Sequence, residues 1–161
     1  MQPQKEDQQV ERFRARCRQR GLPFTAQRRA AYEALLARDD HPTAEQVFEA
    51  VRATLPDVSR MTVYRTLELL VDLGLVHKVC HPGKVARYDC NLHPHHHLVC
   101  VRCNRLVDFE EAAFEGLPSP RAARRLGFEV DDYTVQFRGV CADCGHHGER
   151  RSEQASRRRR S

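Results

Sequence analysis

Four cysteines occur as two pairs of equal spacing, Cys100 with Cys103 and Cys141 with Cys144. Two such pairs can surround one zinc ion with a tetrahedron of thiolates, and a closed tetrahedron is typical of a structural site. A redox-active pair is the alternative, but it usually stands alone at the start of a helix. Because these pairs are flanked by strand-like sequence, they predict one structural zinc ion.

A histidine tract directly before the first cysteine pair offers ligands of another kind. On a strand, His95 and His97 face one side and His96 faces the other. Further candidate ligands are His41, Asp89 and Asp108. Imidazole and carboxylate groups suit Fe²⁺ or Mn²⁺ better than a thiolate site does, although Zn²⁺ would also bind. The tract therefore predicts a second metal site, but spacing alone does not group His41 with it.

The remaining cysteines are Cys17, Cys80 and Cys90. Cys17 falls on the apolar face of a predicted helix, so we expect it in the core. Cys80 and Cys90 lie across a predicted hairpin and could face each other. The first 20 residues do not resemble a signal peptide, and no apolar run is long enough to span a membrane. We therefore expect a reducing cytoplasmic location, where paired cysteines bind metal rather than form disulfides.

Charge is unevenly distributed along the chain, whose formal net charge is +5. Residues 11–29 contain seven arginines and one acidic residue, whereas residues 91–148 contain six basic and eight acidic residues. A basic N-terminal part suits a polyanion such as DNA. The alternative is an arginine-rich face that is simply solvated.

Capping patterns and apolar periodicity predict four helices in the N-terminal part, after a frayed segment at residues 1–9. The helices are expected at residues 10–20, 25–37, from 43 onward and 59–72. Strand-like runs at 75–80 and 85–90 then predict a hairpin. Helices followed by such a hairpin describe a winged helix–turn–helix, in which the fourth helix would be the recognition helix.

The C-terminal part is smaller and alternates strands with a short helix. Strands are expected at residues 98–101, 106–109 and 129–140, and the helix at 120–126. So small a unit usually needs a metal or an oligomer partner. We therefore predict an α+β protein with a winged helix–turn–helix domain at 1–90, a small α/β dimerisation domain held together by zinc at 91–148, and a disordered basic tail at 149–161.

Several motifs resemble those of the ferric uptake regulator family, from about residue 10 to 145. They are TAQR at 25–28, HPTA at 41–44, TVYR at 62–65, GLV at 74–76, HHHLVC at 95–100 and the second cysteine pair. The resemblance implies a homodimeric, metal-dependent repressor that binds a palindromic double-stranded DNA operator.

Within that family the chain is most similar to the peroxide-sensing branch. The resemblance implies a regulatory Fe²⁺ or Mn²⁺ site made of His41, Asp89, His95, His97 and Asp108. An aspartate at 108 matches the peroxide sensors, whereas iron-uptake regulators usually have glutamate there. The resemblance also implies that peroxide oxidises His41 or His95 and thereby releases DNA. Tyr133 stands where iron-uptake regulators tend to carry a further metal ligand, although His96 and Glu115 remain a candidate extra site.

We expect the recognition helix to contact DNA through Arg60, Tyr64 and Arg65. An arginine can read guanine, and Tyr64 can contact a thymine methyl group. Other arginines are expected at phosphates, which would make affinity salt-dependent. They are Arg12, Arg16, Arg18, Arg20 and Arg28.

Three alternatives remain open at this point. The first is an iron- or zinc-responsive uptake repressor with the same fold. The second is a metallohydrolase, although the sequence offers no evident general base and this function would leave the basic helices unexplained. The third is a zinc-ribbon interaction module that does not bind DNA. We expect a regulator rather than an enzyme.

Overall fold

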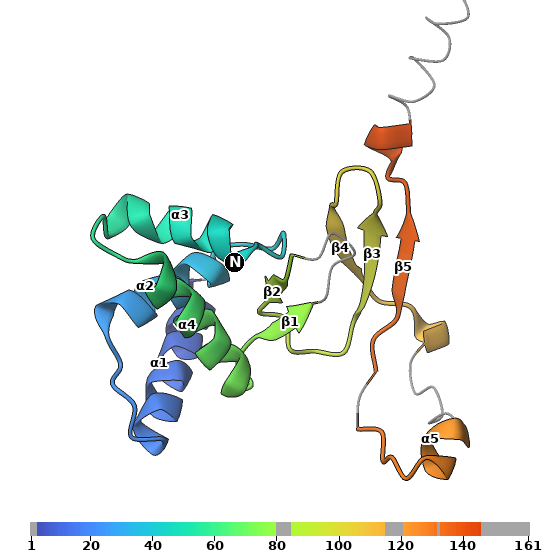
Figure 1. The fold of residues 1–161 in the computed structure, drawn as a ribbon, viewed down its shortest axis with the longest axis horizontal. Helices are drawn as coiled ribbons and strands as arrows, with labels where there is room; N and C mark the ends of the chain where they lie inside the picture. Colours follow the sequence, from blue (N-terminus) through green and yellow to red (C-terminus); the bar gives the residue numbers. More distant parts are fainter. Residues whose placement is uncertain (1–2, 80–84, 115–120, 132, 146–161) are drawn as a thin grey trace, which may run out of the picture. The chain divides into compact units, whose positions relative to one another are not determined.

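The computed structural model describes residues 3–79, 85–114, 121–131 and 133–145. The chain divides into two compact units, of which the first ends at His93 and the second begins at Pro94 (Figure 1). Each unit has its own helices and its own sheet.

Four helices open the first unit. They are α1 (Pro3–Gln19), α2 (Ala26–Leu36), α3 (Ala44–Thr54) and α4 (Arg60–Asp72). Side chains of Thr25, Thr43 and Ser59 each accept a hydrogen bond from the backbone three residues later, so α2, α3 and α4 begin at capped positions. Thr43 and Gln46 form a reciprocal capping box, as the sequence predicted.

The prediction that residues 1–9 are frayed was wrong for residues 3–9, which belong to α1. These residues are polar but include good helix formers such as Glu6 and Gln8. Glu6 also lies in the first turn, where its negative charge interacts favourably with the positive end of the helix dipole. Polarity alone was therefore a poor reason to expect disorder here.

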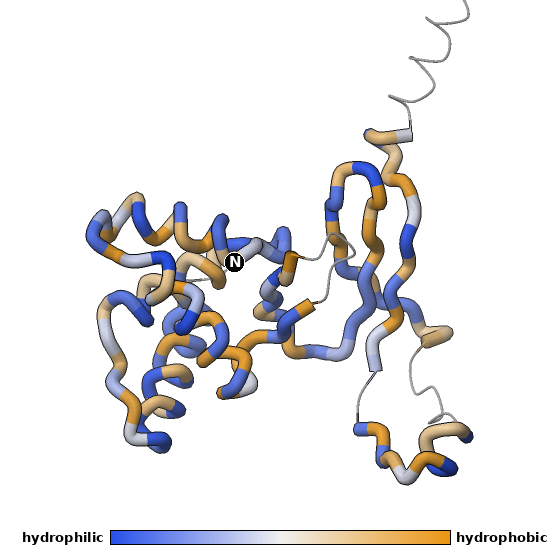
Figure 2. Tube along the Cα trace, viewed as in Figure 1, coloured by the Kyte–Doolittle hydropathy of each residue, from blue (hydrophilic) through white to orange (hydrophobic). Residues whose placement is uncertain are grey.

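The four helices share one apolar core. Phe13 of α1 lies with its ring edge-on to both Phe24 and Tyr32, at centroid distances of 5.4 Å. Helix α4 contributes Val63, Leu67 and Leu70, which are fully buried. Figure 2 shows the resulting alternation of hydrophobic and hydrophilic segments along the helices. Cys17 is fully buried in this core, where burial raises the pKa of its thiol.

A short hairpin completes the first unit. Strand β1 (His77–Val79) pairs antiparallel with β2 (Arg87–Asp89), so that His77 lies opposite Asp89. The hairpin is shorter than predicted because Leu75 and Val76 are buried in the helical core instead of extending the strand. Cys80 lies outside the described residues. The helices and the hairpin together form the predicted winged helix–turn–helix.

The second unit is built on a three-stranded sheet. Its strands are β3 (His96–Cys100), β4 (Leu106–Phe109) and β5 (Gln136–Gly139), in the order β4-β3-β5. The central strand β3 pairs antiparallel with β4 and parallel with β5. A 3-10 turn, η1 (Ala112–Phe114), and a short helix, α5 (Arg121–Arg125), lie between β4 and β5 along the chain. These elements confirm the predicted α+β fold class.

The strand expected at residues 129–140 is only partly present, because β5 covers Gln136–Gly139 alone. Its four residues pair with positions 97–100 of β3, and a strand extends only as far as its partner supports it. Acidic residues such as Asp131 are also depleted in strands. The predicted disorder of the tail at 149–161 concerns residues outside the described part.

Across the described ranges, none of the helices combines the length and apolar character required to cross a membrane.

We expect Ser59→Ala to destabilise the first unit, because the backbone N–H of Thr62 would lose the Ser59 side chain, which accepts at 3.1 Å. Loss of such a cap costs about 0.5–2 kcal/mol. Urea unfolding followed by helical circular dichroism measures the change. Ser59→Asp, which keeps a capping oxygen, is the control and should remain close to wild type. Equal destabilisation by both variants would contradict the capping role.

Candidate metal centres and nucleic-acid interface

The four paired cysteines converge at one end of the sheet in the second unit. Cys100 ends β3, and the parallel register places it opposite Gly139, two residues before Cys141. The four Sγ atoms all lie within 4.8 Å of one another, and those of Cys103 and Cys141 are 3.7 Å apart. The pairing of β3 with β5 therefore brings together thiols that are distant in sequence.

These distances fit a tetrahedral zinc site. With Zn–S bonds of about 2.3 Å, the sulfur atoms of a tetrahedron are roughly 3.8 Å apart. Backbone N–H groups of Cys141 and Cys103 lower the pKa of the Cys100 thiol to about 6, which favours the thiolate form that binds metal. Hydrogen bonds with Cys141 and Cys103 raise the pKa of Cys144 to about 12.

Polar contacts hold the loops that carry the two cysteine pairs. Arg102 donates to the carbonyl oxygen of Cys144 at 2.7 Å, and Arg105 lies 3.4 Å from the carboxylate of Asp143. Asn104 has a φ of 61°, a left-handed conformation that asparagine tolerates better than most residues. The turn after Cys100 is thereby tied to the segment that follows β5.

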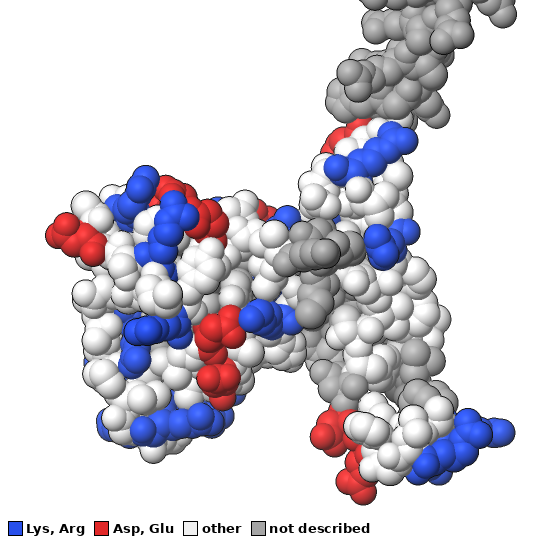
Figure 3. Space-filling model, in the orientation of Figure 1, with Lys and Arg blue, Asp and Glu red and all other residues white. Residues whose placement is uncertain are grey.

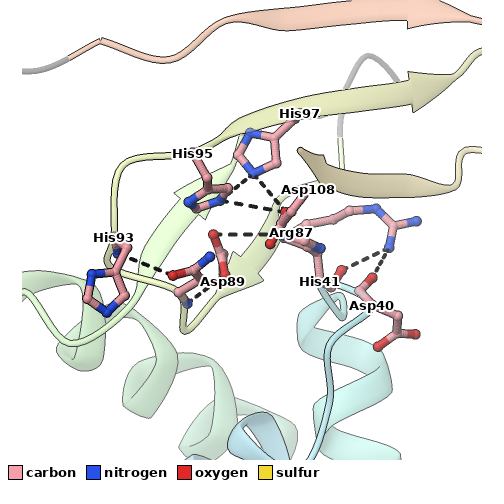
Figure 4. Close-up of polar contacts among 9 residues, drawn as sticks. Asp40, His41, Arg87, Asp89, His93, His95, His97 and Asp108 are labelled. Atoms are coloured by element: carbon pink, nitrogen blue, oxygen red, sulfur yellow. Dashed lines mark hydrogen bonds and ion pairs between the residues drawn. The ribbon is translucent and has the colours of Figure 1, made fainter. Parts of the chain in front are cut away.

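A second group of ligand atoms lies in the same unit, at the start of β3. The Nε2 atoms of His95 and His97 are 3.0 Å apart, and Asp108 Oδ1 lies 3.6 Å and 3.5 Å from them, respectively (Figure 4). The antiparallel register places His97 directly opposite Asp108. His95 precedes the strand, yet its ring lies edge-on to that of His97 at a centroid distance of 4.7 Å.

This triad, meaning His95, His97 and Asp108, has the spacing of ligands around one ion. With metal–ligand bonds of about 2.1 Å, neighbouring ligand atoms are roughly 3.0 to 3.4 Å apart. Two histidines and one carboxylate on one face of an ion are typical of non-haem Fe²⁺ sites that keep open positions. The donor set and its spacing therefore fit Fe²⁺ or Mn²⁺.

His96 faces away from the triad and lies among aromatic rings. Its ring stacks on Tyr133 at a centroid distance of 6.1 Å and also contacts Phe109 and Phe114. The backbone N–H of Val135 donates to His96 Nδ1 at 3.3 Å. Glu115, the other residue of the candidate extra site, lies outside the described residues, so that site stays a prediction.

The first unit contains the other two candidate ligands of the regulatory site. His41 Nε2 lies 3.7 Å from Asp89 Oδ2, which joins the loop before α3 to the end of β2. The Asp89 Oδ1 atom accepts a hydrogen bond from the backbone N–H of Asn91 at 2.7 Å. His41 and Asp89 thus form a pair that could supply one nitrogen and one oxygen ligand.

The neighbouring Cys90 has none of the features of a reactive thiol. It packs against the helical core, and burial raises the pKa of its thiol to about 12. A protonated buried thiol is a poor nucleophile and a poor metal ligand.

The candidate recognition helix α4 presents polar and apolar groups to solvent. Tyr64 is 42% exposed, and Arg65 and Met61 are also exposed. Arg60 is exposed too, but its guanidinium lies over the Phe48 ring and pairs with Glu45 of α3. Tyr64 and Arg65 are therefore available for contacts with a partner. Arg60 would first have to give up its ion pair with Glu45.

The five candidate phosphate contacts come from α1, from the turn that follows it and from α2. Arg12, Arg16 and Arg18 are exposed on α1. Arg20 donates to the carbonyl oxygen of Asp72 at 3.4 Å, and Arg28 is half-buried and donates to that of Pro23. Figure 3 shows basic groups distributed over the visible face of the helical unit.

The sheet of the second unit exposes an apolar row. Val107, Leu98 and Phe137 are neighbours across the three strands, and each is at least 40% exposed. Beside them is a cavity of about 330 Å³ lined by Leu98, Val107, Val140 and five neighbouring residues. Figure 3 shows a wide uncharged area on this unit. An exposed apolar face is suited to contact with another protein.

Sequence reasoning missed the polar contacts that hold the hairpin. Tyr88 donates to Glu68 of α4 at 2.9 Å, and Lys78 lies 2.8 Å from the same carboxylate. Arg87 donates to the carbonyl oxygen of His41 at 2.9 Å. The sequence carried no pattern from which these contacts could have been predicted.

Comparisons with known proteins agree with this arrangement of elements. Residues 19–138 match the sequence profile of the Ferric uptake regulator family. The peroxide-responsive repressor PerR of Staphylococcus epidermidis is 30% identical over 142 residues, which cover 88% of this chain and 94% of that protein.

Two solved structures share the fold. The Helicobacter pylori ferric uptake regulator, with three functional metal binding sites, superposes with a TM-score of 0.75 at 19% identity, covering 87% of this chain and 93% of that one. The Pseudomonas aeruginosa ferric uptake regulator with manganese superposes with a TM-score of 0.63 at 28% identity, covering 80% and 97%.

We expect Cys144→Ser to lose the tightly held zinc, because three thiolates bind a structural zinc ion far less tightly than four. Elemental analysis after gel filtration should find about one zinc ion per wild-type chain and much less in the variant. Cys17→Ala, which removes a thiol outside the tetrad, should keep its zinc. Full zinc content in Cys144→Ser would exclude the tetrathiolate site.

Proposed function

The chain belongs to the ferric uptake regulator family, and on this premise we propose that it is a metal-dependent, DNA-binding repressor that senses peroxide. The observation that carries the proposal is the triad of His95, His97 and Asp108, with ligand atoms 3.0–3.6 Å apart. A site of two histidines and one carboxylate is suited to Fe²⁺ and leaves positions at which a small oxidant can bind.

The regulatory ion is Fe²⁺ or Mn²⁺ in this proposal, and the structural ion is Zn²⁺. Iron and manganese prefer more ligands than the triad offers. We propose that His41 and Asp89 supply two of them, because they form a ready pair of matching donor types in the first unit. Metal binding would then favour one arrangement of the two units, which is a population shift driven by ligand affinity.

DNA binding is assigned to the winged helix–turn–helix. Helix α4 would enter the major groove, with Tyr64 and Arg65 nearest the bases and Arg60 released from Glu45 on binding. Arginines of α1 and α2 would contact phosphates, which makes affinity fall as salt rises. Such a protein acts where the chromosome is, so the proposal places it in the cytoplasm.

The operator is expected to be palindromic because the protein would bind as a homodimer. The apolar row of Val107, Leu98 and Phe137 supports this expectation, since an exposed face of this kind suits a second copy of the chain. The relative from Staphylococcus epidermidis is itself a repressor, and we propose a regulator rather than an enzyme here too.

Peroxide sensing would use the ligands themselves. If bound there, Fe²⁺ would supply the redox chemistry that cleaves the O–O bond of hydrogen peroxide. In the net reaction one peroxide oxygen would be added at a C–H of a nearby imidazole, which is oxidised by two electrons, and the other oxygen would leave as water. We propose His41 or His95 as that imidazole. Oxidation would weaken metal binding and lower DNA affinity, whereas Mn²⁺ would support repression without this reaction.

The runner-up is an iron- or zinc-responsive uptake repressor of the same family. The Pseudomonas aeruginosa ferric uptake regulator, 28% identical, carries manganese in its structure and favours this alternative. The shorter carboxylate of Asp108 favours peroxide sensing, because the resemblance associates aspartate with that branch. A comparison of Asp108→Glu with wild type separates the two functions.

We expect Mn²⁺ to raise DNA affinity of the wild type by roughly 10- to 100-fold, a common range of coupling. His97→Ala should abolish most of this increase, because the triad loses a ligand. Fluorescence anisotropy with a duplex selected from a random library by Mn²⁺-loaded wild type measures the effect. His93→Ala, in the same tract but outside the proposed ligands, is the matched control. An unchanged Mn²⁺ response in His97→Ala would refute the regulatory site.

We expect peroxide to add one oxygen to a histidine in Fe²⁺-loaded protein. Tryptic peptides that contain His41 or His95 should gain the mass of one oxygen, as measured by mass spectrometry. Mn²⁺-loaded protein is the control and should stay unmodified, and Asp108→Glu should be oxidised more slowly. If no histidine peptide gains oxygen, the peroxide function is excluded and the uptake repressor remains.

A further inference from the structure

The backbone at His41 is held in an unfavourable conformation. Its φ is 51°, in the left-handed region that few residues other than glycine adopt readily. His41 also precedes Pro42, and the residue before a proline prefers an extended backbone. Such a conformation persists only where surrounding contacts impose it, and it is often found at functional sites.

Arg87 of strand β2 contacts the backbone at this position directly. Its Nη1 donates to the carbonyl oxygen of His41 at 2.9 Å and approaches that of Asp40 at 3.5 Å (Figure 4). The backbone N–H of Tyr88 donates to the carbonyl oxygen of Pro42 at 3.0 Å, and Thr43 forms an isolated β-bridge with Arg87. The loop before α3 is thereby fixed to β2.

Strand β2 also carries Asp89, whose Oδ2 lies 3.7 Å from His41 Nε2. Arg87 and Asp89 are two residues apart on one strand, so they project to the same side. Arg87 contacts the backbone of His41 while Asp89 faces its imidazole. Tyr88 projects to the other side and reaches Glu68 on α4. One short strand therefore connects the His41 loop to the recognition helix.

We propose that Arg87 is a positioning residue for the regulatory metal site: its guanidinium holds the His41 loop in the left-handed conformation that aims the imidazole at Asp89. The inference rests on the proposed role of His41 and Asp89 as metal ligands. Residues that orient a metal ligand typically contribute 10- to 100-fold to metal affinity. Without Arg87, the loop would relax to an extended backbone and His41 would be misplaced.

The test measures Mn²⁺ affinity by electron paramagnetic resonance of free Mn²⁺ in the full-length protein. Arg87→Met should weaken binding by at least about tenfold, whereas Arg87→Lys, which keeps one cationic donor, should recover part of the loss. Arg38→Met is the matched control, because Arg38 bonds to the carboxylate of Asp40 and not to the loop carbonyls. Zinc content and DNA affinity at saturating Mn²⁺ should stay near wild type, since a general loss of structure would lower both.

His41→Ala is measured alongside to separate this inference from the proposed function. If His41→Ala weakens Mn²⁺ binding and Arg87→Met does not, the positioning role is overturned and the metal site stands. If neither variant changes Mn²⁺ affinity, both are overturned. If Arg87→Met does not fold, Arg87→Lys and Arg87→Gln carry the test, and wild-type Mn²⁺ affinity in both would overturn the inference.

Discussion

The pairing register of strand β3 determines both candidate metal centres of the second unit. Its antiparallel register with β4 sets His97 opposite Asp108, and its parallel register with β5 sets Cys100 opposite Gly139, next to the second cysteine pair. A slip of one residue would turn every side chain of β3 to the other face. The triad would then lose His97, and the apolar row would lose Leu98. The register therefore sets which face of the sheet carries His97 and which carries Leu98.

In the first unit, both the helical core and the hairpin hold helix α4 in place. The buried side of α4 fixes the helix in the core, so its exposed side presents Tyr64 and Arg65. The bond from Tyr88 to Glu68 connects that helix to β2, where Asp89 lies. The Lys78 side chain and this hydrogen bond lower the pKa of the Glu68 carboxyl, so it stays ionised and keeps both partners at neutral pH. Asp89, a proposed metal ligand, is thus connected through Tyr88 and Glu68 to α4, the proposed recognition helix.

Much of the fold followed from local rules in the sequence. Caps at Thr25, Thr43 and Ser59 start helices where they were expected, because a cap depends on neighbouring residues only. Residues 129–140 were harder to predict, because strand length depends on a partner distant in sequence. The zinc site could be predicted from the spacing of the cysteine pairs. The grouping of His41 with the other regulatory-site ligands came only from the family resemblance. Arg87 gave no signal, because its partner is a backbone carbonyl, which every residue possesses.

The parallel pairing of β3 with β5 has a consequence for how the chain can vary. Both β4 and β5 are fixed to β3, and they are joined by residues 110–135. The entropic cost of closing a flexible connection grows only with the logarithm of its length. Each doubling adds about 0.6 kcal/mol. Insertions or deletions between β4 and β5 should therefore leave the thiolate cluster almost undisturbed. The length and surface of this connection can therefore vary while β4 and β5, at its two ends, stay paired to β3.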